Sequence, residues 1–142
     1  MGEATDVMRR KMAAFNAHDM GKMLSYFSPA IRREVPGAHL EGRDQLAAFF
    51  GAFWEAFPDI EVTVTSVVEE GSVVAIQAKT RGTHLGTLRT PGGDIPATGR
   101  HINLPISDQY HVEGGLIVSA HLHFDRLTLL EQLGVVPAPA PA

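Results

Sequence analysis

INLPISDQYHVEGGLIVSAHLHF, residues 102–124, alternates apolar and polar side chains on both sides of a pair of glycines. A period of two is typical of strands that have one buried face. Residues 113–115, Glu-Gly-Gly, provide the glycines that a tight hairpin turn needs. The stretch therefore predicts two antiparallel strands, at about residues 102–112 and 116–124.

Two earlier segments share this period. Residues 60–65 alternate Ile, Val and Val with Glu, Thr and Thr, and residues 72–81 alternate in the same way after a turn at Gly71. Both segments predict strands. Residues 82–98 are rich in Gly and Pro, which predicts a long loop of the kind that often borders a binding site.

Helices are predicted on either side of the strands. The apolar stripe of the first, which ends near His18, consists of Val7, Met8, Lys11, Met12 and Phe15. Asp19 can cap a second helix that ends before Ser28-Pro29, and residues 46–57 predict an aromatic third helix that stops at Pro58. A short last helix is expected between Asp125 and Gly134.

This order of elements predicts an α+β fold, a cone-shaped barrel in which N-terminal helices pack on a curved antiparallel sheet and enclose an apolar small-molecule pocket. A chain of 142 residues suits one domain, which we place at residues 1–136. Residues 137–142 read PAPAPA, which predicts an extended or disordered tail.

Composition excludes several classes of function. The net charge is −4, and the short basic clusters at residues 9–11 and 32–33 are interpreted as solvated faces, so we expect no nucleic-acid partner. The chain has no cysteine, which excludes disulfides and thiolate chemistry. A charged N-terminal segment and the lack of a membrane-spanning apolar run predict a cytoplasmic protein without a membrane partner.

A series of short motifs extends along nearly the whole chain. They are FNAHD at 15–19, GR at 42–43, FPD at 57–59, GTHLG at 82–86, TGR at 98–100, Asp125, and LLEQLG at 129–134. Their order resembles the SnoaL-like polyketide cyclase or ester cyclase family, within the nuclear transport factor two-like (ketosteroid isomerase-like) superfamily. The resemblance implies ring closure by intramolecular aldol condensation, with one acidic side chain and no metal or organic cofactor.

The resemblance also locates the acid. It implies a family acid three residues before Asp125, where this chain has Leu122, and a family histidine at the position of Asp108. Asp108 shares an otherwise apolar strand face with Tyr110, and desolvation raises the pKa of a carboxylate. We therefore predict that Asp108 abstracts a proton and that Tyr110 stabilises the enolate. The alternatives are a structural carboxylate bonded to Arg or backbone and a buried hydroxyl satisfied by a neighbour.

Further residues are candidates for substrate binding. The aromatic helix can serve as core and as cavity wall. Glu34 and Arg33 are either pocket residues or solvated charges, and His84 either reaches the pocket or holds its loop. The predicted binding residues are Tyr26, Glu34, Phe50, Phe53, Trp54, His84, Leu122 and Phe124.

His121 and His123 are two residues apart on one strand, as two metal ligands could be. The apolar pattern of that strand instead places Val118 inward, and the two histidines outward together with Ile117. We therefore expect no metal site, and a homodimer contact on the outer face of the sheet.

Together, the residues and the resemblance predict a cofactor-free polyketide or ester cyclase that acts on a small apolar carbonyl compound by acid–base chemistry. The alternatives are a non-catalytic small-molecule-binding protein of the same fold and a related isomerase or hydrolase. Their common requirement is an apolar pocket, because the same fold can host enzymes and binding proteins.

Overall fold

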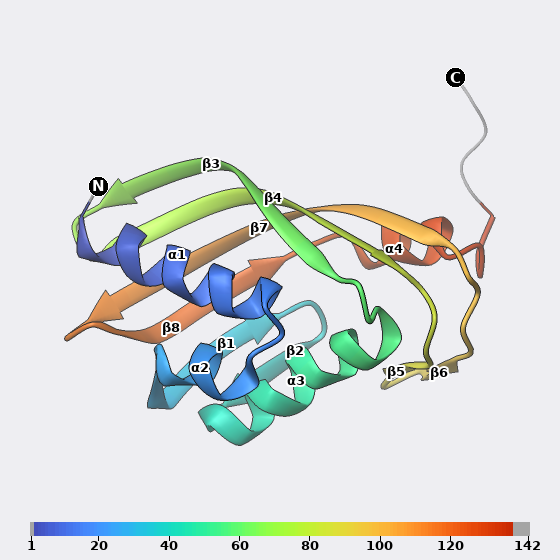
Figure 1. The fold of residues 1–142 in the computed structure, drawn as a ribbon, viewed down its shortest axis with the longest axis horizontal. Coiled ribbons are helices and arrows are strands. Elements are labelled where there is room, and N and C mark those ends of the chain that lie inside the picture. The colour runs from blue at the N-terminus through green and yellow to red at the C-terminus, as the bar shows by residue number, and fades with distance from the viewer. Residues whose placement is uncertain (1, 138–142) are drawn as a thin grey trace.

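A curved sheet of six strands forms one layer of the protein, and helices cover its inner face (Figure 1). The computed structural model describes residues 2–137. The strand order is β2-β1-β8-β7-β4-β3. These strands are β1 Phe27–Val35, β2 Ala38–Glu41, β3 Glu61–Glu70, β4 Val73–Thr83, β7 His101–Glu113 and β8 Leu116–His123. Neighbouring strands are antiparallel except β1 and β8, which run parallel.

Four helices complete the main fold: α1 Glu3–Asn16, α2 Met20–Ser25, α3 Gly42–Ala56 and α4 Arg126–Gln132. The predicted caps are present, since Asp19 accepts a hydrogen bond from the Lys22 amide at 3.1 Å and Asp125 accepts one from Leu127 at 3.0 Å. The predicted α+β fold class is confirmed, with one correction: the sheet is mixed and not purely antiparallel, because β1 and β8 run parallel. Most of the predicted Pro-Ala tail, residues 138–142, lies outside the described residues.

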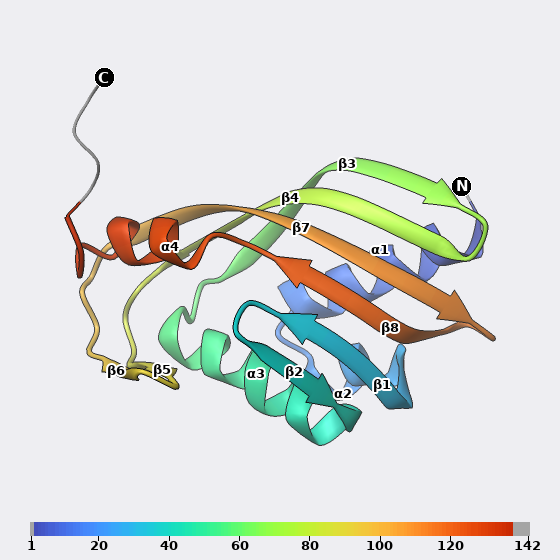
Figure 2. The same cartoon turned by 180° about the vertical axis from the view of Figure 1, so that it is seen from behind.

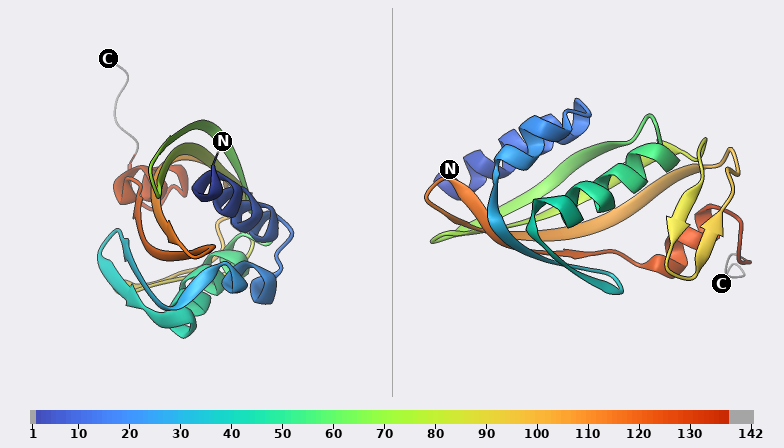
Figure 3. Two further views of the ribbon diagram at one scale, coloured as in Figure 1. Left: turned by 90° about the vertical axis from the view of Figure 1, so that its left-hand side faces the viewer. Right: turned by 90° about the horizontal axis from the view of Figure 1, so that it is seen from below.

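The sheet curls around its own inner face. Seen from one end, α1 and α3 close the open side of this curve (Figure 3), and the view from behind shows the strands crossing the opposite side (Figure 2). Helix α1 contacts β3, β4 and β7, whereas α3 packs against β1 and β2. The space between the two helices and the sheet is where a ligand cavity can form.

The second helix is shorter than predicted, and two strands follow it that the sequence did not predict. The helix ends at Ser25, and β1 and β2 lie on either side of a turn at Pro36 and Gly37. In β1, Ile31, Arg33 and Val35 alternate inward and are all buried. Because Arg33 interrupts the alternation of apolar side chains, the sequence pattern does not predict a strand here.

The expected long loop also contains structure. Residues 88–95 include a small hairpin, β5 Leu88–Thr90 and β6 Gly93–Ile95, which is separate from the main sheet. Leu88 is buried, and β5 contacts α3. The hairpin thus lies beside the end of the aromatic helix.

The start of β8 differs from the prediction as well. Ile117, expected on the outer face, is fully buried, and Val118 is only half-buried. The pairing of β7 with β8 shifts register between His111 and Val112, and such a bulge changes which side chains face inward. Beyond the bulge, His121 and His123 are exposed, as expected.

Candidate functional site

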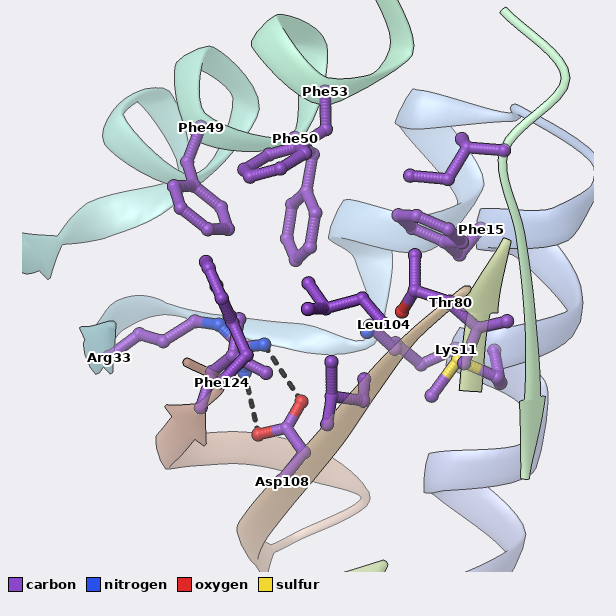
Figure 4. Close-up of a pocket in the computed structure, with 15 residues that line it drawn as sticks. Lys11, Phe15, Arg33, Phe49, Phe50, Phe53, Thr80, Leu104, Asp108 and Phe124 are labelled. Carbon is purple, nitrogen blue, oxygen red and sulfur yellow. Dashed lines mark hydrogen bonds and ion pairs between the residues drawn. The ribbon is translucent and has the colours of Figure 1, made fainter. Parts of the chain in front are cut away.

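A cavity lies between α1, α3 and the inner face of β1, β4, β7 and β8 (Figure 4). Its wall is mainly apolar, and Phe49, Phe50 and Phe53 project into it from successive turns of α3. The open volume is about 60 Å³. Pockets that hold drug-sized ligands measure roughly 300–1,000 Å³. A ligand of that size therefore requires side chains of the wall to move.

Four polar or charged side chains interrupt the apolar wall: Lys11, Arg33, Thr80 and Asp108. Each of these residues is buried, with at most 9% of its surface exposed. Burying a charged side chain is unfavourable unless it is paired or changes its protonation state. Lys11, Arg33 and Asp108 therefore need specific partners.

Arg33 and Asp108 form a buried ion pair. The Arg33 Nη2 donates to Asp108 Oδ2 at 2.8 Å, Nη1 donates to Oδ1 at 3.3 Å, and the two side chains are 1% and 2% exposed. Burial alone would lower the pKa of Arg33, but the charge of Asp108 and then Tyr110 raise it above its ordinary value. The guanidinium thus holds the carboxylate in a fixed orientation.

Tyr110 is the second partner of Asp108. Its hydroxyl donates to Asp108 Oδ2 at 2.6 Å, and the backbone amide of Gln109 donates to Oδ1 at 3.1 Å. Burial, followed by the negative charge of Asp108, raises the pKa of Tyr110 well above its ordinary value. The phenol therefore keeps its proton and donates a hydrogen bond to the carboxylate over the whole physiological pH range.

Lys11 reaches the same group from α1. Its Nζ donates to the Tyr110 hydroxyl at 3.3 Å and lies 5.0 Å from the centre of the Phe50 ring and 5.4 Å from that of Phe15. Burial, and then the positive charge of Arg33, lower the pKa of Lys11 from 10.5 to about 7, although Asp108 opposes this. We call Lys11, Tyr110, Asp108 and Arg33 the buried polar network.

Several predicted site residues meet at this cavity. Asp108, Phe50, Phe53, Leu122 and Phe124 line it. Tyr110 is not among the lining residues. Its side chain is fully buried, and its hydroxyl is bonded to Asp108.

The other predicted binding residues lie away from the cavity wall. Trp54 stacks on His18 with ring centres 5.1 Å apart. Glu34 is exposed on the opposite face of β1 and pairs with His39. The buried His84 packs against Phe57, and its Nδ1 lies 2.9 Å from the Thr98 hydroxyl. Tyr26 caps α2 and is not among the lining residues.

The sequence interpretation favoured a solvated position for two charged members of the site, Lys11 and Arg33, and left a pocket role for Arg33 as the alternative. Both residues are buried. A signal for Lys11 is present, since it occupies a position of the apolar stripe of α1 between Met8 and Met12. A long side chain in such a stripe can equally extend its charge to solvent, so spacing alone did not decide the case.

Within residues 2–137, no three or more His, Asp or Glu side chains are grouped so that they could hold a metal ion. Over the same residues, no helix has both the length and the apolar character needed to cross a membrane.

Solved structures of several bacterial proteins share the fold. A protein from Jannaschia sp. CCS1 assigned to the SnoaL-like polyketide cyclases is 23% identical, with a TM-score of 0.82, over 95% of this chain and 94% of its own. IdmH from Streptomyces antibioticus, to which a polyketide cyclase function is ascribed, is 28% identical, with a TM-score of 0.78, over 94% and 99%.

AclR from Streptomyces galilaeus, to which a hydroxylase function is ascribed, has the same fold. It is 22% identical, with a TM-score of 0.83, over 97% of this chain and 85% of its own. Proteins with curated descriptions gave no match. The family model described as SnoaL-like polyketide cyclase matches residues 5–133, which include every strand and helix that builds the cavity except the first two residues of α1. The chain therefore belongs to the SnoaL-like polyketide cyclase family.

Proposed function

We propose that the protein is a cofactor-free cyclase-type enzyme that acts on a small apolar carbonyl compound. Asp108 would accept a proton from the carbon next to the carbonyl group, which starts an intramolecular aldol-type reaction. The observation that carries this proposal is a carboxylate, buried and held by Arg33, on the wall of a largely apolar cavity.

The position of Asp108 supports the exchange of one acid for another. Asp108 on β7 pairs directly with Leu122 on β8, and both residues line the cavity. The β-carbons of directly paired residues are about 5 Å apart. The carboxylate therefore lies next to the position where the resemblance implies the family acid.

The Arg33 guanidinium and the protonated form of Lys11 are available to stabilise the negative charge of an enolate. Arg33 and Lys11 both line the cavity, and an electrostatic interaction is stronger in a dry site than in water. The Nε of Arg33 is buried and has no hydrogen-bond partner among residues 2–137. In this proposal Tyr110 acts through Asp108, since its hydroxyl is bonded to that carboxylate.

Ligand entry would require rearrangement of the aromatic wall. Phe49, Phe53 and Phe124 are only half-buried, and Phe53 meets Phe124 edge-on with ring centres 6.3 Å apart. Rotation of these rings would enlarge the space next to Asp108. The substrate would then displace water from the whole site, as carbanion chemistry requires.

One observation favours a different function, non-catalytic binding of an apolar molecule. The Asp108 carboxylate already accepts hydrogen bonds from Arg33, Tyr110 and the Gln109 amide. A carboxylate held in this way can be a purely structural part of the cavity wall. Ligand binding without proton transfer would support this second function.

We further propose that the protein is one domain over residues 1–136, acts in the cytoplasm and forms a homodimer through the outer face of the sheet. On that face His121 of β8 pairs with Gln109 of β7 and with Glu34 of β1, and all three side chains are exposed. A second copy could cover this polar surface.

Exchange of carbon-bound hydrogen tests the enzymatic proposal without knowledge of the substrate. The probe is 2-tetralone, an apolar ketone with an acidic carbon–hydrogen bond, in deuterated buffer. We expect the protein to accelerate deuterium incorporation and Asp108→Asn to lower that rate by roughly 10²–10⁴, while the probe still binds. Binding of the probe with no accelerated exchange by the unmodified protein would contradict the proposal and support the binding function.

A further inference from the structure

Lys11 is an amine inside the cavity. The chain contains three lysines, at positions 11, 22 and 79, and only Lys11 lines the cavity. It is 3% exposed, whereas Lys22 is exposed and Lys79 is half-buried on a strand position that faces away from the cavity. The acid–base function proposed above gives Lys11 no role beyond its charge.

Burial and the nearby charge of Arg33 favour the neutral, nucleophilic form of Lys11. The faces of the Phe15, Phe50 and Tyr110 rings attract its cation, but no carboxylate pairs with the amine directly, and its Nζ donates a hydrogen bond to the neutral Tyr110 hydroxyl. A pKa of about 7 leaves roughly half of the amine unprotonated at neutral pH. An ordinary lysine is almost fully protonated there and cannot attack a carbonyl carbon.

We propose that Lys11 condenses with the carbonyl group of the substrate and forms an imine. This inference rests on the proposed function, because it requires a carbonyl compound in the cavity. It adds a nucleophile to that function and restricts the substrate to an aldehyde or ketone at the reacting position. An ester or a carboxylate would not form an imine.

The reaction balances with one proton from solvent. The Nζ lone pair forms a bond to the carbonyl carbon, the π pair of the carbonyl moves to oxygen, and a proton transfers from nitrogen to that oxygen. The oxygen then takes up one proton from solvent, the carbon–oxygen bond breaks, water leaves, and a protonated imine remains. Asp108 can remove a proton from the adjacent carbon to give an enamine, and addition of water to the imine later restores the free amine.

The buried polar network connects the amine to the carboxylate. Lys11 Nζ lies 3.3 Å from the Tyr110 hydroxyl, which lies 2.6 Å from Asp108 Oδ2. A proton leaving the attacking nitrogen can therefore pass to Tyr110 while Tyr110 passes its own proton to Asp108, and Asp108 becomes a carboxylate again when it gives that proton to the carbonyl oxygen. Arg33 keeps the carboxylate in position during this transfer.

Reductive trapping tests the imine. The full-length protein is incubated with 2-tetralone and sodium cyanoborohydride, which reduces a protonated imine to a stable secondary amine, and intact mass and peptide mapping locate the adduct. We expect one adduct at Lys11, at least about tenfold more abundant than those at Lys22 and Lys79. Lys11→Arg, which keeps the positive charge, should remove it, and Lys22→Arg should leave it unchanged.

The outcome is separable from that of the exchange experiment. Asp108→Asn should still form the adduct although it loses deuterium exchange, because the nucleophile remains. Equal labelling of the three lysines, or no adduct at Lys11 in the unmodified protein, would overturn the imine proposal. If Lys11→Arg also keeps the full exchange rate, the amine has no part in catalysis while the role of Asp108 stands.

Discussion

Asp108 on β7 lies directly across the sheet from Leu122 on β8. The two side chains face the same cavity, so Asp108 lies only one strand away from the position where the resemblance implies the family acid. Arg33 comes from β1, on the far side of β8, and reaches over to pair with Asp108. Asp108 thus has a counter-ion from a strand that sequence reading did not predict.

A reciprocal exchange of the two residues tests this relationship. Asp108→Leu alone should lower the rate of 2-tetralone exchange by roughly 10²–10⁴. Adding Leu122→Asp to this variant should raise the exchange rate at least about tenfold, because a carboxylate is again present on the same cavity wall. The measurement is the deuterium incorporation rate of the two variants. The melting temperature of each variant shows whether it is folded. A double variant that folds but recovers no activity would show that the two positions are not equivalent.

The Arg33–Asp108 pair should contribute strongly to the stability of the folded protein. Asp108→Asn removes the negative charge and leaves a buried guanidinium without its counter-ion, which should destabilise the fold by roughly 3–5 kcal/mol. Arg33→Met together with Asp108→Asn removes both charges and should recover most of that loss. Urea unfolding of the three proteins measures the difference. Equal destabilisation of the single and double variants would contradict a buried ion pair.

Lys11 should make stability depend on pH in a defined direction. Its pKa is about 7 in the folded protein and 10.5 in an ordinary lysine, so between these values the unfolded chain binds more protons and stability rises with pH. Lys11→Met removes this dependence. It should stabilise the protein most below pH 7, by about 5 kcal/mol at the upper limit, and progressively less as the pH approaches 10.5.

Urea unfolding at a series of pH values measures that difference. The matched control is Lys22→Met, because Lys22 is exposed and the stability difference between this variant and the unmodified protein should not change comparably with pH. A Lys11→Met profile that runs parallel to that of the unmodified protein would mean that the amine keeps its ordinary pKa.

Glu34 provides a negative prediction. The sequence places it among the binding residues, but its side chain lies on the outer face of β1, paired with His39. Glu34→Gln should therefore leave the exchange rate and 2-tetralone binding unchanged. A loss of binding comparable to that of a cavity variant such as Phe53→Ala would place Glu34 in a ligand site.

The proposed homodimer has its own test. His121→Glu places a carboxylate in the middle of the exposed outer face, opposite Gln109 and next to Glu34. If two copies meet there, like charges will repel and the dimer should dissociate. Light scattering on the unmodified protein and the variant measures the change in molecular mass. If the unmodified protein is itself a monomer, the proposed dimer is refuted.

The periodic parts of the chain were predictable from sequence. The alternation in β4, β7 and β8 and the stripe of α1 predicted the curved sheet and its covering helices, and Asp108 was correctly expected on an inward strand face. These elements follow the simple rule that apolar side chains repeat with the period of the structure.

The missed parts share one physical cause. In β1 a buried Arg33 replaces an apolar side chain, and in α1 a buried Lys11 does the same, so each looks solvated from sequence. Their burial depends on Asp108 and Tyr110, which are distant in sequence and meet them only in the folded chain. The bulge that turns Ile117 inward also arises from strand pairing and has no local signature.

The central claim is that the carboxylate of Asp108 transfers the proton. Its most direct test is the 2-tetralone exchange rate of Arg33→Met compared with that of Arg33→Met/Asp108→Asn, because only the carboxylate differs between these two proteins and neither retains a buried guanidinium. We predict that the first exchanges hydrogen at least about a hundredfold faster than the second. Equal rates in two folded proteins that both bind the ketone would contradict the account.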